Sequence, residues 1–579
     1  MVEMTGAEMI VEALYREQVE VIFGYPGGAV LPIYDELYET DFRHVMPHHE
    51  QGGAHAADGY ARSTGNPGVC IATSGPGGTN LVTGLATAYM DSVPVVAFTG
   101  QVPGSMIGTD AFQEADITGI TVPITKHNYL VQGVEDIPRI VREAFHIAQT
   151  GRPGPVLVDI PKNLQQETGE FFYPDEVDLP GYKPNYWGHE LQVEAAAEAV
   201  NEAQQPVLYA GGGVISSGGS HELRELAKKA DIPVTTTLTG LGAFDEQQEL
   251  SLGMPGMHGT AEANLAISNT DLLIAVGARF DDRVTGKLEE FAPEAEIIHI
   301  DIDPAEVGKR VRPDIPIVGD VKNVLRQLNP LVEEDEHPDW KAQIAEWREM
   351  SQGERAEENK LLPHQIVETI YELTDGDAII TTEVGQHQMW AAQFYQYSQP
   401  RSFISSGGLG TMGYGFPAAL GAQVGNEERT VFALAGDGSF QMNQQELATA
   451  AKNNLPVNIV LFNNQYLGMV RQWQEMFYDK RYSATCLREQ ANCPEDCSGP
   501  GDEQCPEVTP NFVKLAEAYG IKSKQITEVE EIKPALEEAI KTPEPYLLDF
   551  VIAEEENVFP MVPPGGTLDN MVLRGDADE

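Results

Sequence analysis

Two short polar motifs follow successive apolar runs in the last third of the chain. Gly436-Asp437-Gly438-Ser439 comes after the strand-like run at residues 430–435, and Asn463-Asn464 comes after the run at 457–462. The helix-like segment at 444–451 lies between the runs, so the pattern predicts two parallel strands whose carboxyl ends share one edge of a sheet. Asp437 and Asn464 offer oxygen ligands suited to Mg²⁺, and the flanking glycines let a phosphate approach the backbone. An isolated Gly-Asp-Gly is usually a mere turn, but the paired asparagine favours a metal and diphosphate site.

A second candidate for chemistry is a carboxylate near the N-terminus. Glu50 stands at the entrance of residues 51–62, a run of small residues that predicts a helix. A glutamate at a helix start is often no more than a partner for the helix dipole. A carboxyl group can also do general acid–base work, and the predicted metal and diphosphate site in the same chain favours that role for Glu50.

Alternating patterns along the whole chain indicate what positions these groups. Short β-branched apolar runs alternate with helix-period stretches, which is typical of βαβ units with buried parallel sheets. The pattern and the length predict an α/β fold of three doubly wound parallel-sheet domains. We expect linkers at 174–184, which lacks any period, and at 332–359, which is charged and sparsely apolar. The predicted domains are residues 1–175, 185–340 and 355–579.

The composition argues against several classes of partner. No apolar run among the 579 residues approaches the length of a membrane span. The chain carries 37 Lys and Arg against 89 Asp and Glu, a net charge of −52, which repels nucleic acid and anionic membranes. The N-terminus lacks the basic and apolar parts of a secretory signal, so we expect a cytoplasmic protein. The acidic excess is spread along the chain and predicts a halophilic source, with an ordinary acidic cytosolic enzyme as the alternative.

The Gly-Asp-Gly motif with its paired asparagines resembles the fingerprint of the thiamine-diphosphate enzyme superfamily. The resemblance implies Mg²⁺ held by Asp437, Asn464 and the backbone carbonyl of Tyr466. It implies that Glu50 lies beside N1′ of the aminopyrimidine ring, where it exchanges a proton. Because this glutamate and the diphosphate site come from different subunits in the superfamily, a homodimer or tetramer is implied. The residues implied to contact the diphosphate are Gln386, His387, Gly436, Gly438 and Ser439.

Segments spread over nearly the whole chain are similar to acetohydroxyacid synthase, a family within this superfamily. These segments are residues 24–29, 74–80, 108–113, 126–129, 151–156, 405–410 and 463–473. The resemblance implies decarboxylation of pyruvate and transfer of the two-carbon remainder to pyruvate or 2-oxobutyrate, giving 2-acetolactate or 2-aceto-2-hydroxybutyrate. That is the first common step of branched-chain amino acid biosynthesis. A separate regulatory small subunit is also implied.

The same resemblance assigns residues around the reacting centre. Trp473 would line the pocket for the second oxo acid and favour 2-oxobutyrate, and Arg283 would pair with the carboxylate of that acid. A Met or Trp at such a position is more often plain core. The other residues implied nearby are Gly28, Phe112, Gln113 and Lys162, and those implied to support the thiamine cofactor are Gly410, Met412 and Met469.

The middle third carries a glycine triplet after a strand-like run. Such a triplet could cradle a dinucleotide pyrophosphate or simply form a tight turn. Five segments, at 209–214, 237–240, 256–259, 277–283 and 299–303, match the FAD sites of the family in order, which implies a bound FAD with a structural role. The residues carried over are Arg152, Gly211, Gly212, Gly213, Thr237, Leu238, Gly256, Met257, His258, Gly277, Arg279, Asp301, Ile302 and Asp320.

The chain departs from the family at several places. Ser105 stands where relatives often have an arginine that would pair with Asp282, and Tyr466 replaces a common histidine. Four of the five cysteines fall in an apparent insertion after Tyr482. Their spacing matches no common zinc module, so reduced thiols or a disulfide are favoured over bound Zn²⁺. These cysteines are Cys486, Cys493, Cys497 and Cys505.

Three competing hypotheses involve related proteins. A flavin-containing relative such as pyruvate oxidase would reduce its flavin with pyruvate at a competent rate. Glyoxylate carboligase lacks the activating glutamate, so Glu50 argues against it. A cofactor-binding subunit that serves only as a partner platform would have no need for Glu50, Asp437 and Asn464 together.

Overall fold

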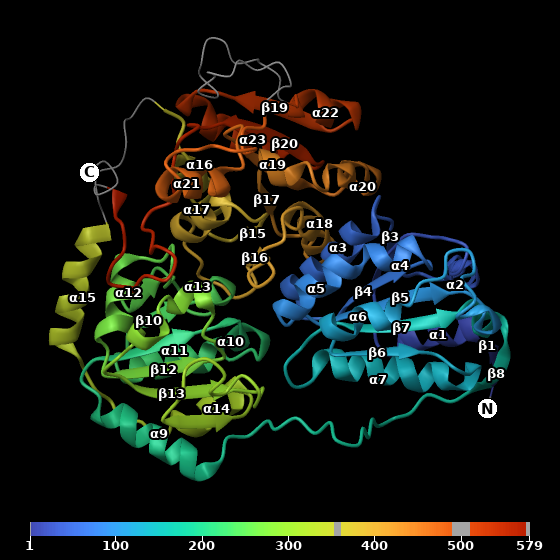
Figure 1. Cartoon of the computed structure of the whole chain (residues 1–579), viewed down its shortest axis with the longest axis horizontal. Coiled ribbons are helices and arrows are strands. Elements are labelled where there is room, and N and C mark those ends of the chain that lie inside the picture. Colours follow the sequence, from blue (N-terminus) through green and yellow to red (C-terminus); the bar gives the residue numbers. More distant parts are fainter. Residues whose placement is uncertain (1, 352–359, 489–509, 575–579) are drawn as a thin grey trace.

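The computed structural model describes residues 2–351, 360–488 and 510–574. The chain forms three domains, each built on a six-stranded parallel sheet packed against helices (Figure 1). This architecture confirms the predicted fold class. Within these residues, no helix combines the length and the apolar character needed to cross a membrane.

The first domain contains a sheet with the strand order β3-β2-β4-β5-β7-β6. Its strands are β2 (Val21–Gly24), β3 (Arg43–Val45), β4 (Gly68–Ala72), β5 (Val95–Gln101), β6 (His127–Leu130) and β7 (Val156–Pro161). Its helices are α1 (Gly6–Arg16), α2 (Leu31–Leu37), α3 (Glu50–Thr64), α4 (Pro76–Asn80), α5 (Val82–Met90), α6 (Ile117–Thr121), α7 (Ile137–Gln149) and α8 (Lys162–Gln166). A separate antiparallel pair, β1 (Val2–Thr5) and β8 (Thr168–Phe171), joins the two ends of this domain.

The central domain has the order β11-β10-β9-β12-β13-β14. This order reverses direction between β9 and β12, which creates a topological switch point where open α/β sheets bind ligands. The strands are β9 (Pro206–Ala210), β10 (Val234–Thr236), β11 (Ser251–Gly253), β12 (Leu272–Val276), β13 (Glu296–Asp301) and β14 (Ile315–Val318). The helices are α9 (Glu190–Glu202), α10 (Gly212–Ser216), α11 (Ser220–Lys229), α12 (Ala261–Asn269), α13 (Asp282–Thr285), α14 (Val321–Leu328) and α15 (Pro338–Ser351).

The last domain has the order β16-β15-β17-β18-β20-β19, which repeats the order of the first domain when strands are counted along the chain. The strands are β15 (Ile379–Thr382), β16 (Phe403–Ser405), β17 (Val431–Gly436), β18 (Val457–Asn463), β19 (Lys522–Ile526) and β20 (Tyr546–Val551). The helices are α16 (Pro363–Thr374), α17 (Gln386–Phe394), α18 (Gly415–Gly425), α19 (Asp437–Phe440), α20 (Leu447–Asn453), α21 (Gly468–Phe477), α22 (Phe512–Ala518) and α23 (Ile532–Lys541). The predicted helix at 444–451 is therefore a 3₁₀ turn, η6 (Gln444–Glu446), followed by α20.

Helices α3 and α18 join the first and last domains (Figure 1). Both are rich in small residues, and their backbones touch. A Cβ atom on Gly59 would lie 2.1 Å from the carbonyl oxygen of Ala418, and one on Gly421 would lie 1.8 Å from that of Ala56. One hydrophobic core consequently runs through both domains.

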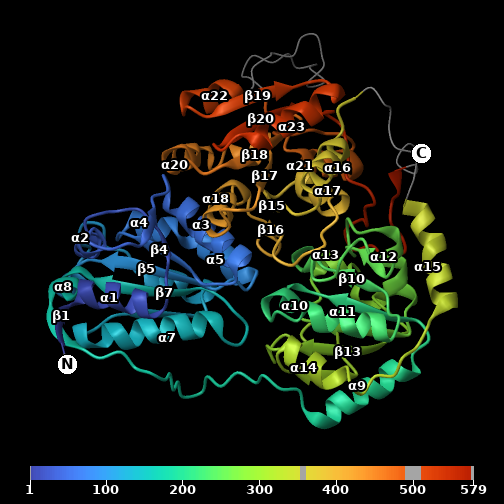
Figure 2. The ribbon, with the colours of Figure 1, turned by 180° about the vertical axis from the view of Figure 1, so that it is seen from behind.

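The two expected linkers turned out differently. Residues 174–184 contain no helix or strand and run as an extended segment toward α9 (Figure 2). The expectation for 332–359 is wrong in its described part, because α15 occupies residues 338–351. Trp340 and Ile344 are buried and belong, with Trp347, to a core shared with α12. The helical spacing of these three residues was obscured by the charged residues around them.

Candidate active site

The carboxyl ends of three neighbouring strands bring the predicted metal and diphosphate residues together. In the last sheet β15, β17 and β18 lie side by side, and Gln386, Asp437 and Asn464 come shortly after them. Asn464 Nδ2 donates to Gln386 Oε1 at 3.3 Å. Asp437 Oδ2 accepts from the backbone N–H of Gln465 at 2.9 Å, and Asn464 Oδ1 accepts from that of Tyr466 at 3.1 Å. Both side-chain oxygens therefore meet the turn that carries the Tyr466 carbonyl.

The chemistry of this edge suits a divalent cation. Asp437 is 3% exposed, and burial raises the pKa of its carboxyl to about 8. A buried carboxylate is unfavourable without a nearby positive charge, which Mg²⁺ would provide. Three buried polar atoms at this edge make no hydrogen bond within the described residues: His387 Nε2, Asn463 Oδ1 and Gln465 Oε1. A carboxylate, an amide oxygen and a backbone carbonyl form a ligand set of the hard kind that Mg²⁺ prefers.

Glycines at this edge allow close approach of the segments. A Cβ atom on Gly468 would lie 2.1 Å from Gln386 Oε1, and one on Gly436 would lie 3.0 Å from the His387 ring. Ser439 Oγ donates to the carbonyl of Gly436 at 3.1 Å, which closes the turn after β17. A residue larger than glycine at position 468, the first residue of α21, would therefore displace Gln386.

Glu50 begins helix α3 at one edge of the first sheet, as predicted. The preceding residue, His49, caps the helix by accepting the backbone N–H of Gln51 at its Nδ1, at 3.0 Å. Asn80 Nδ2 donates to Glu50 Oε2 at 2.8 Å. The other predicted residues of this domain, Gly28, Phe112, Gln113 and Lys162, follow the carboxyl ends of β2, β5 and β7 in the same sheet.

A carboxylate of the last domain holds the backbone just before Glu50. Glu446 is 1% exposed, and each of its carboxylate oxygens accepts the N–H of His48 at 3.1 Å. The hydroxyl of Thr449 donates to the same carboxylate at 2.6 Å. Burial nevertheless raises the pKa of Glu446 to about 7. The segment after the Gly-Asp-Gly motif is thereby tied to the start of α3 within one chain.

A cavity of about 780 Å³ lies among all three domains. The predicted flavin residues that line it are Arg152, Gly211, Gly212, Gly213, Thr237, Leu238, Met257, His258, Gly277, Arg279, Asp301, Ile302 and Asp320. Gly256 is outside the lining, although its neighbours Pro255 and Met257 belong to it. Gly410, Met412 and Met469 also face this cavity. The structure thus gathers the predicted flavin residues and the predicted thiamine-supporting residues around one space.

The glycine triplet lies at the switch point of the central sheet. Gly211 to Gly213 follow β9, and Gly277 follows the adjacent strand β12. A Cβ atom on Gly213 would lie 2.7 Å from the Cα of Gly277, whose φ of +58° also favours glycine. The two strand ends can approach this closely only without side chains, and they leave a crevice of the kind that accepts a dinucleotide pyrophosphate.

Arg283 and Trp473 come together although they belong to different domains. The guanidinium carbon of Arg283 lies 6.0 Å from the centroid of the Trp473 ring, and both residues line the 780 Å³ cavity. Arg283 Nη1 is 3.8 Å from the carboxylate of Asp282, the residue that would have paired with an arginine at position 105. Trp473 also lines a second, smaller cavity of about 660 Å³ with Tyr478 and Arg481.

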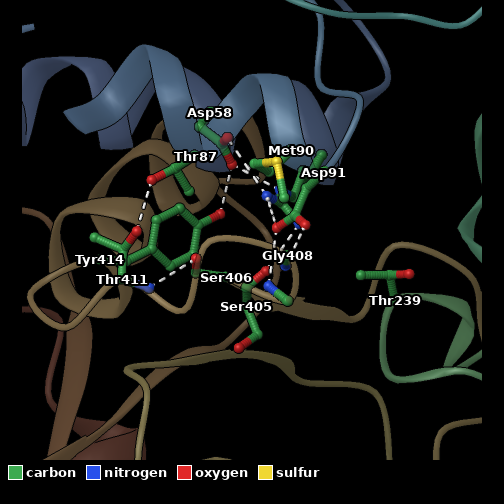
Figure 3. Close-up of polar contacts among 12 residues, drawn as sticks. Asp58, Thr87, Met90, Asp91, Thr239, Ser405, Ser406, Gly408, Thr411 and Tyr414 are labelled. Atoms are coloured by element: carbon green, nitrogen blue, oxygen red, sulfur yellow. Dashed lines mark hydrogen bonds and ion pairs between the residues drawn. The ribbon is translucent and has the colours of Figure 1, made fainter. Parts of the chain in front are cut away.

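A buried polar network at the domain junction had no signal in the sequence (Figure 3). Arg62 of α3 pairs with Asp58 at 2.6 Å and with Asp91 at 2.9 Å. Asp91 accepts the backbone N–H groups of Gly407 and Gly408 at 2.9 and 2.6 Å. These contacts fasten the loop after β16 to the first domain and to the rim of the 780 Å³ cavity.

The same loop is held at its far end by hydroxyl groups (Figure 3). Tyr414 donates to Asp58, and the Oγ1 atoms of Thr87 and Thr411 lie 2.8 Å apart. Met412 lies between these two anchors. The network therefore fixes the backbone around a residue predicted to support the thiamine cofactor.

The cysteine prediction falls mostly outside the described residues. Cys493, Cys497 and Cys505 are not described. The backbone of Cys486 pairs with that of Tyr466 in an isolated antiparallel β-bridge. Within the described ranges there is no group of three or more His, Cys, Asp and Glu residues that could hold a metal. The Asp437 site is of another kind, because amide and carbonyl oxygens complete it.

Comparisons with known proteins find matches in all three domains. Family models for thiamine pyrophosphate enzymes match as the N-terminal TPP binding domain over residues 4–120, the central domain over 193–328 and the C-terminal TPP binding domain over 383–550. A probable acetolactate synthase large subunit from Methanocaldococcus jannaschii is 52% identical, covering 98% of this chain and 95% of the relative.

Two further relatives match over a similar share of the chain. The acetolactate synthase large subunit of Corynebacterium glutamicum is 50% identical over 97% of this chain and 89% of its own length. Chloroplastic acetolactate synthase 2 of Nicotiana tabacum is 49% identical over 99% of this chain and 85% of its own length. The chain therefore belongs to the acetolactate synthase family of thiamine pyrophosphate enzymes.

Proposed function

We propose that this chain is a catalytic subunit that decarboxylates pyruvate and joins the two-carbon remainder to pyruvate or 2-oxobutyrate. The products would be 2-acetolactate and 2-aceto-2-hydroxybutyrate, at the first common step of branched-chain amino acid biosynthesis. The observation that carries the proposal is the meeting of Gln386, Asp437 and Asn464 at three adjacent strand ends. The printed names of the relatives support the choice of reaction.

The last domain would hold the diphosphate end of the cofactor. Asp437, Asn464 and the Tyr466 carbonyl would bind Mg²⁺, and the residues around the diphosphate would be Gln386, His387, Gly436, Gly438 and Ser439. When bound, thiamine diphosphate would supply a thiazolium carbon that is nucleophilic once deprotonated and a ring that can accept the electron pair released with carbon dioxide. Glu50 would give and take a proton at N1′ of the aminopyrimidine, a task that needs a carboxyl group.

The acceptor would bind beside Trp473. Arg283 lies against the indole and has the planar donor geometry that pairs with a carboxylate. Met412, Met469 and Gly410 would support the thiamine cofactor, and the residues that would approach from the first domain are Gly28, Phe112, Gln113 and Lys162.

FAD would occupy the central crevice with its pyrophosphate at Gly211 to Gly213. The support for this is the gathering of the predicted flavin residues around one cavity at the switch point. The proposed reaction transfers no net electrons, so the flavin would serve the structure rather than the chemistry.

The first domain would meet a second copy of the chain. The segment after β5 exposes several large apolar residues, with Phe112 87% and Val122 64% exposed. Exposed apolar surface of this kind marks a contact site. Glu50 accepts a hydrogen bond from Asn80 and packs beside Gly77, and both of these residues belong to its own domain. A homodimer or tetramer in which this edge covers the cofactor of a partner would complete the site.

Three further features belong to the proposal. Two of the relatives are named large subunits, so a separate regulatory small subunit would bind this chain. The domains would span residues 1–175, 185–340 and 355–579, with the rest of α15 continuing the central domain beyond residue 340. The protein would be cytoplasmic, and its net charge of −52 supports one that works in concentrated salt.

The deciding experiment supplies purified protein with pyruvate, thiamine diphosphate, Mg²⁺ and FAD. We expect carbon dioxide and 2-acetolactate, with 2-aceto-2-hydroxybutyrate when 2-oxobutyrate is added. Reduction of the flavin by pyruvate at the rate of turnover would instead identify an oxidase. Absence of carbon dioxide release would overturn the proposed activity.

A further inference from the structure

Asn80 makes the hydrogen bond that fixes one oxygen of Glu50. Its Nδ2 lies 2.8 Å from Glu50 Oε2, a distance typical of a charge-assisted bond to a carboxylate. The two residues come from different segments, since Glu50 starts α3 and Asn80 ends α4 after β4. The contact therefore depends on the fold of the sheet edge and not on local sequence.

The turn that carries Asn80 is itself closely fitted around Glu50. A Cβ atom on Gly77 would lie 2.8 Å from Cγ2 of Thr73 and 3.4 Å from Glu50 Oε1. Thr73 Oγ1 accepts the N–H of Ala29 at 3.1 Å, which ties the Gly28 loop to the same turn. Backbone thus lies along one side of the carboxylate while the Asn80 amide holds Oε2 in place.

We propose that Asn80 is a positioning residue for Glu50, which it holds through Oε2 so that the carboxyl group keeps one orientation for proton exchange with the aminopyrimidine. This inference rests on the proposed function. A carboxylate without this partner could rotate about its last side-chain bond and present either oxygen, or turn away. A neutral amide restricts that rotation without adding a charge, so Glu50 can still both lose and regain its proton.

A positioning role for Asn80 can be distinguished from a purely structural one by measuring the rate of hydrogen–deuterium exchange at the thiazolium carbon of bound thiamine diphosphate. We expect Asn80→Ala to slow this exchange by about 10- to 100-fold, the effect of losing a hydrogen bond to a charged group. The dissociation constant for thiamine diphosphate should change by less than about threefold, because the diphosphate is held by the last domain. Thr79→Ala is the matched control, since the Thr79 hydroxyl lies on the same helix and bonds the carbonyl of Pro76.

An isosteric variant gives a second readout. Asn80→Asp keeps the shape but places a second carboxylate beside Glu50, and a proton shared by two close carboxylates is held more tightly. The acid limb of the pH–rate profile should therefore move to higher pH in Asn80→Asp. The proposal would be overturned if the acid limb of the pH–rate profile of Asn80→Asp stayed at the parental pH. It would also be overturned if hydrogen–deuterium exchange in Asn80→Ala were as fast as in the parent.

A double-mutant cycle distinguishes this proposal from the proposed function. If Asn80 acts through Glu50, adding Asn80→Ala to Glu50→Gln should change exchange by less than about twofold. Full turnover in Glu50→Gln alone would refute the role of Glu50 in the proposed function. Loss of turnover in Glu50→Gln, with additive effects of the two substitutions, would refute only the role of Asn80.

Discussion

The first and last domains share one strand order but present different chemistry at the same edge. In both sheets the loops after the strands carry the polar residues of the site. The first edge offers Glu50, which can move a proton, and Asn80, which hydrogen-bonds it, whereas the last edge offers Asp437 and Asn464, which can hold a cation. The shared topology decides where a site can form, and the residues after each strand decide what it does.

The two domains also pack through equivalent elements. Helix α3 follows the second strand of its sheet along the chain, and α18 follows the second strand of the last sheet. These two helices pack against each other where the two similar domains meet, and the Asp58 and Asp91 network lies at that junction (Figure 3). The two domains differ in the exposure of their site residues, because Asp437 is buried whereas Phe112 and the segment around it are exposed.

Glu50→Gln tests whether the first edge supplies the proton chemistry. The amide keeps the size of the side chain but cannot exchange a proton, so turnover should fall by about 100- to 10,000-fold. Binding of thiamine diphosphate and FAD, followed by titration, should remain near that of the parent. Turnover within a factor of about three of the parent, less than 1 kcal/mol in barrier, would remove Glu50 from the mechanism.

Asp437→Ala tests the opposite property of the last edge. Affinities for Mg²⁺ and thiamine diphosphate should fall together by at least about 10- to 100-fold, a range seen even for outer-shell partners of metals. Isothermal titration with and without Mg²⁺ measures both. Unchanged cofactor affinity would contradict the metal site.

Mixing these two variants sharpens the comparison further. If each site combines Glu50 of one subunit with Asp437 of another, a mixed dimer contains one intact site and one doubly altered site. Random association in a symmetric dimer should then restore about one quarter of parental turnover. No recovery after verified subunit exchange would place both residues in the site of a single chain.

The sequence predicted regular features far better than long-range polar contacts. Residues 430–435 and 457–462 were recognisable strands because apolar β-branched runs suit a buried parallel sheet, and they became β17 and β18. The Gly-Asp-Gly motif was correctly predicted to lie at the end of a strand, because an apolar run directly precedes it. Asp91 could not be predicted, because its partners Gly407 and Gly408 lie far away along the chain. Asn80 lay in a recognised motif, but only the fold shows its bond to Glu50.

Glu446→Gln tests how the two domains are tied together. The folded pKa of Glu446 is about 7 against an ordinary 4.5, so the folded chain holds this proton more tightly. The stability that the group contributes is present below pH 4.5 and is lost as the pH rises through about 7. Glutamine does not titrate and can still accept the His48 N–H. The variant should gain stability relative to the parent as the pH rises, by about 3 kcal/mol at most.

Thermal unfolding of Glu446→Gln and the parent at pH 5, 6, 7 and 8 measures this difference. Glu446→Ala serves as the control, because it removes the acceptor at every pH. A difference between Glu446→Gln and the parent that does not change with pH would show that the carboxyl stays ionised in the folded chain throughout this range.

Trp473→Leu gives the smallest expected effect and tests a contact to which neither edge contributes. Trp473 comes from α21 of the last domain and meets Arg283 of the central domain, so it should act on the choice of acceptor rather than on decarboxylation. Acceptors that differ by one methylene are separated by about 1–3 kcal/mol in an apolar pocket, and leucine leaves part of that wall missing. With both oxo acids competing, the ratio of 2-aceto-2-hydroxybutyrate to 2-acetolactate should fall toward unity by about tenfold, while acetolactate formation from pyruvate alone is kept.

Phe477→Leu is the matched control, because the ring of Phe477 lies 5.7 Å from that of Trp473 on the same helix. A parental ratio in Trp473→Leu would remove the indole from the acceptor pocket, and loss of decarboxylation would show that Trp473 supports the site as a whole.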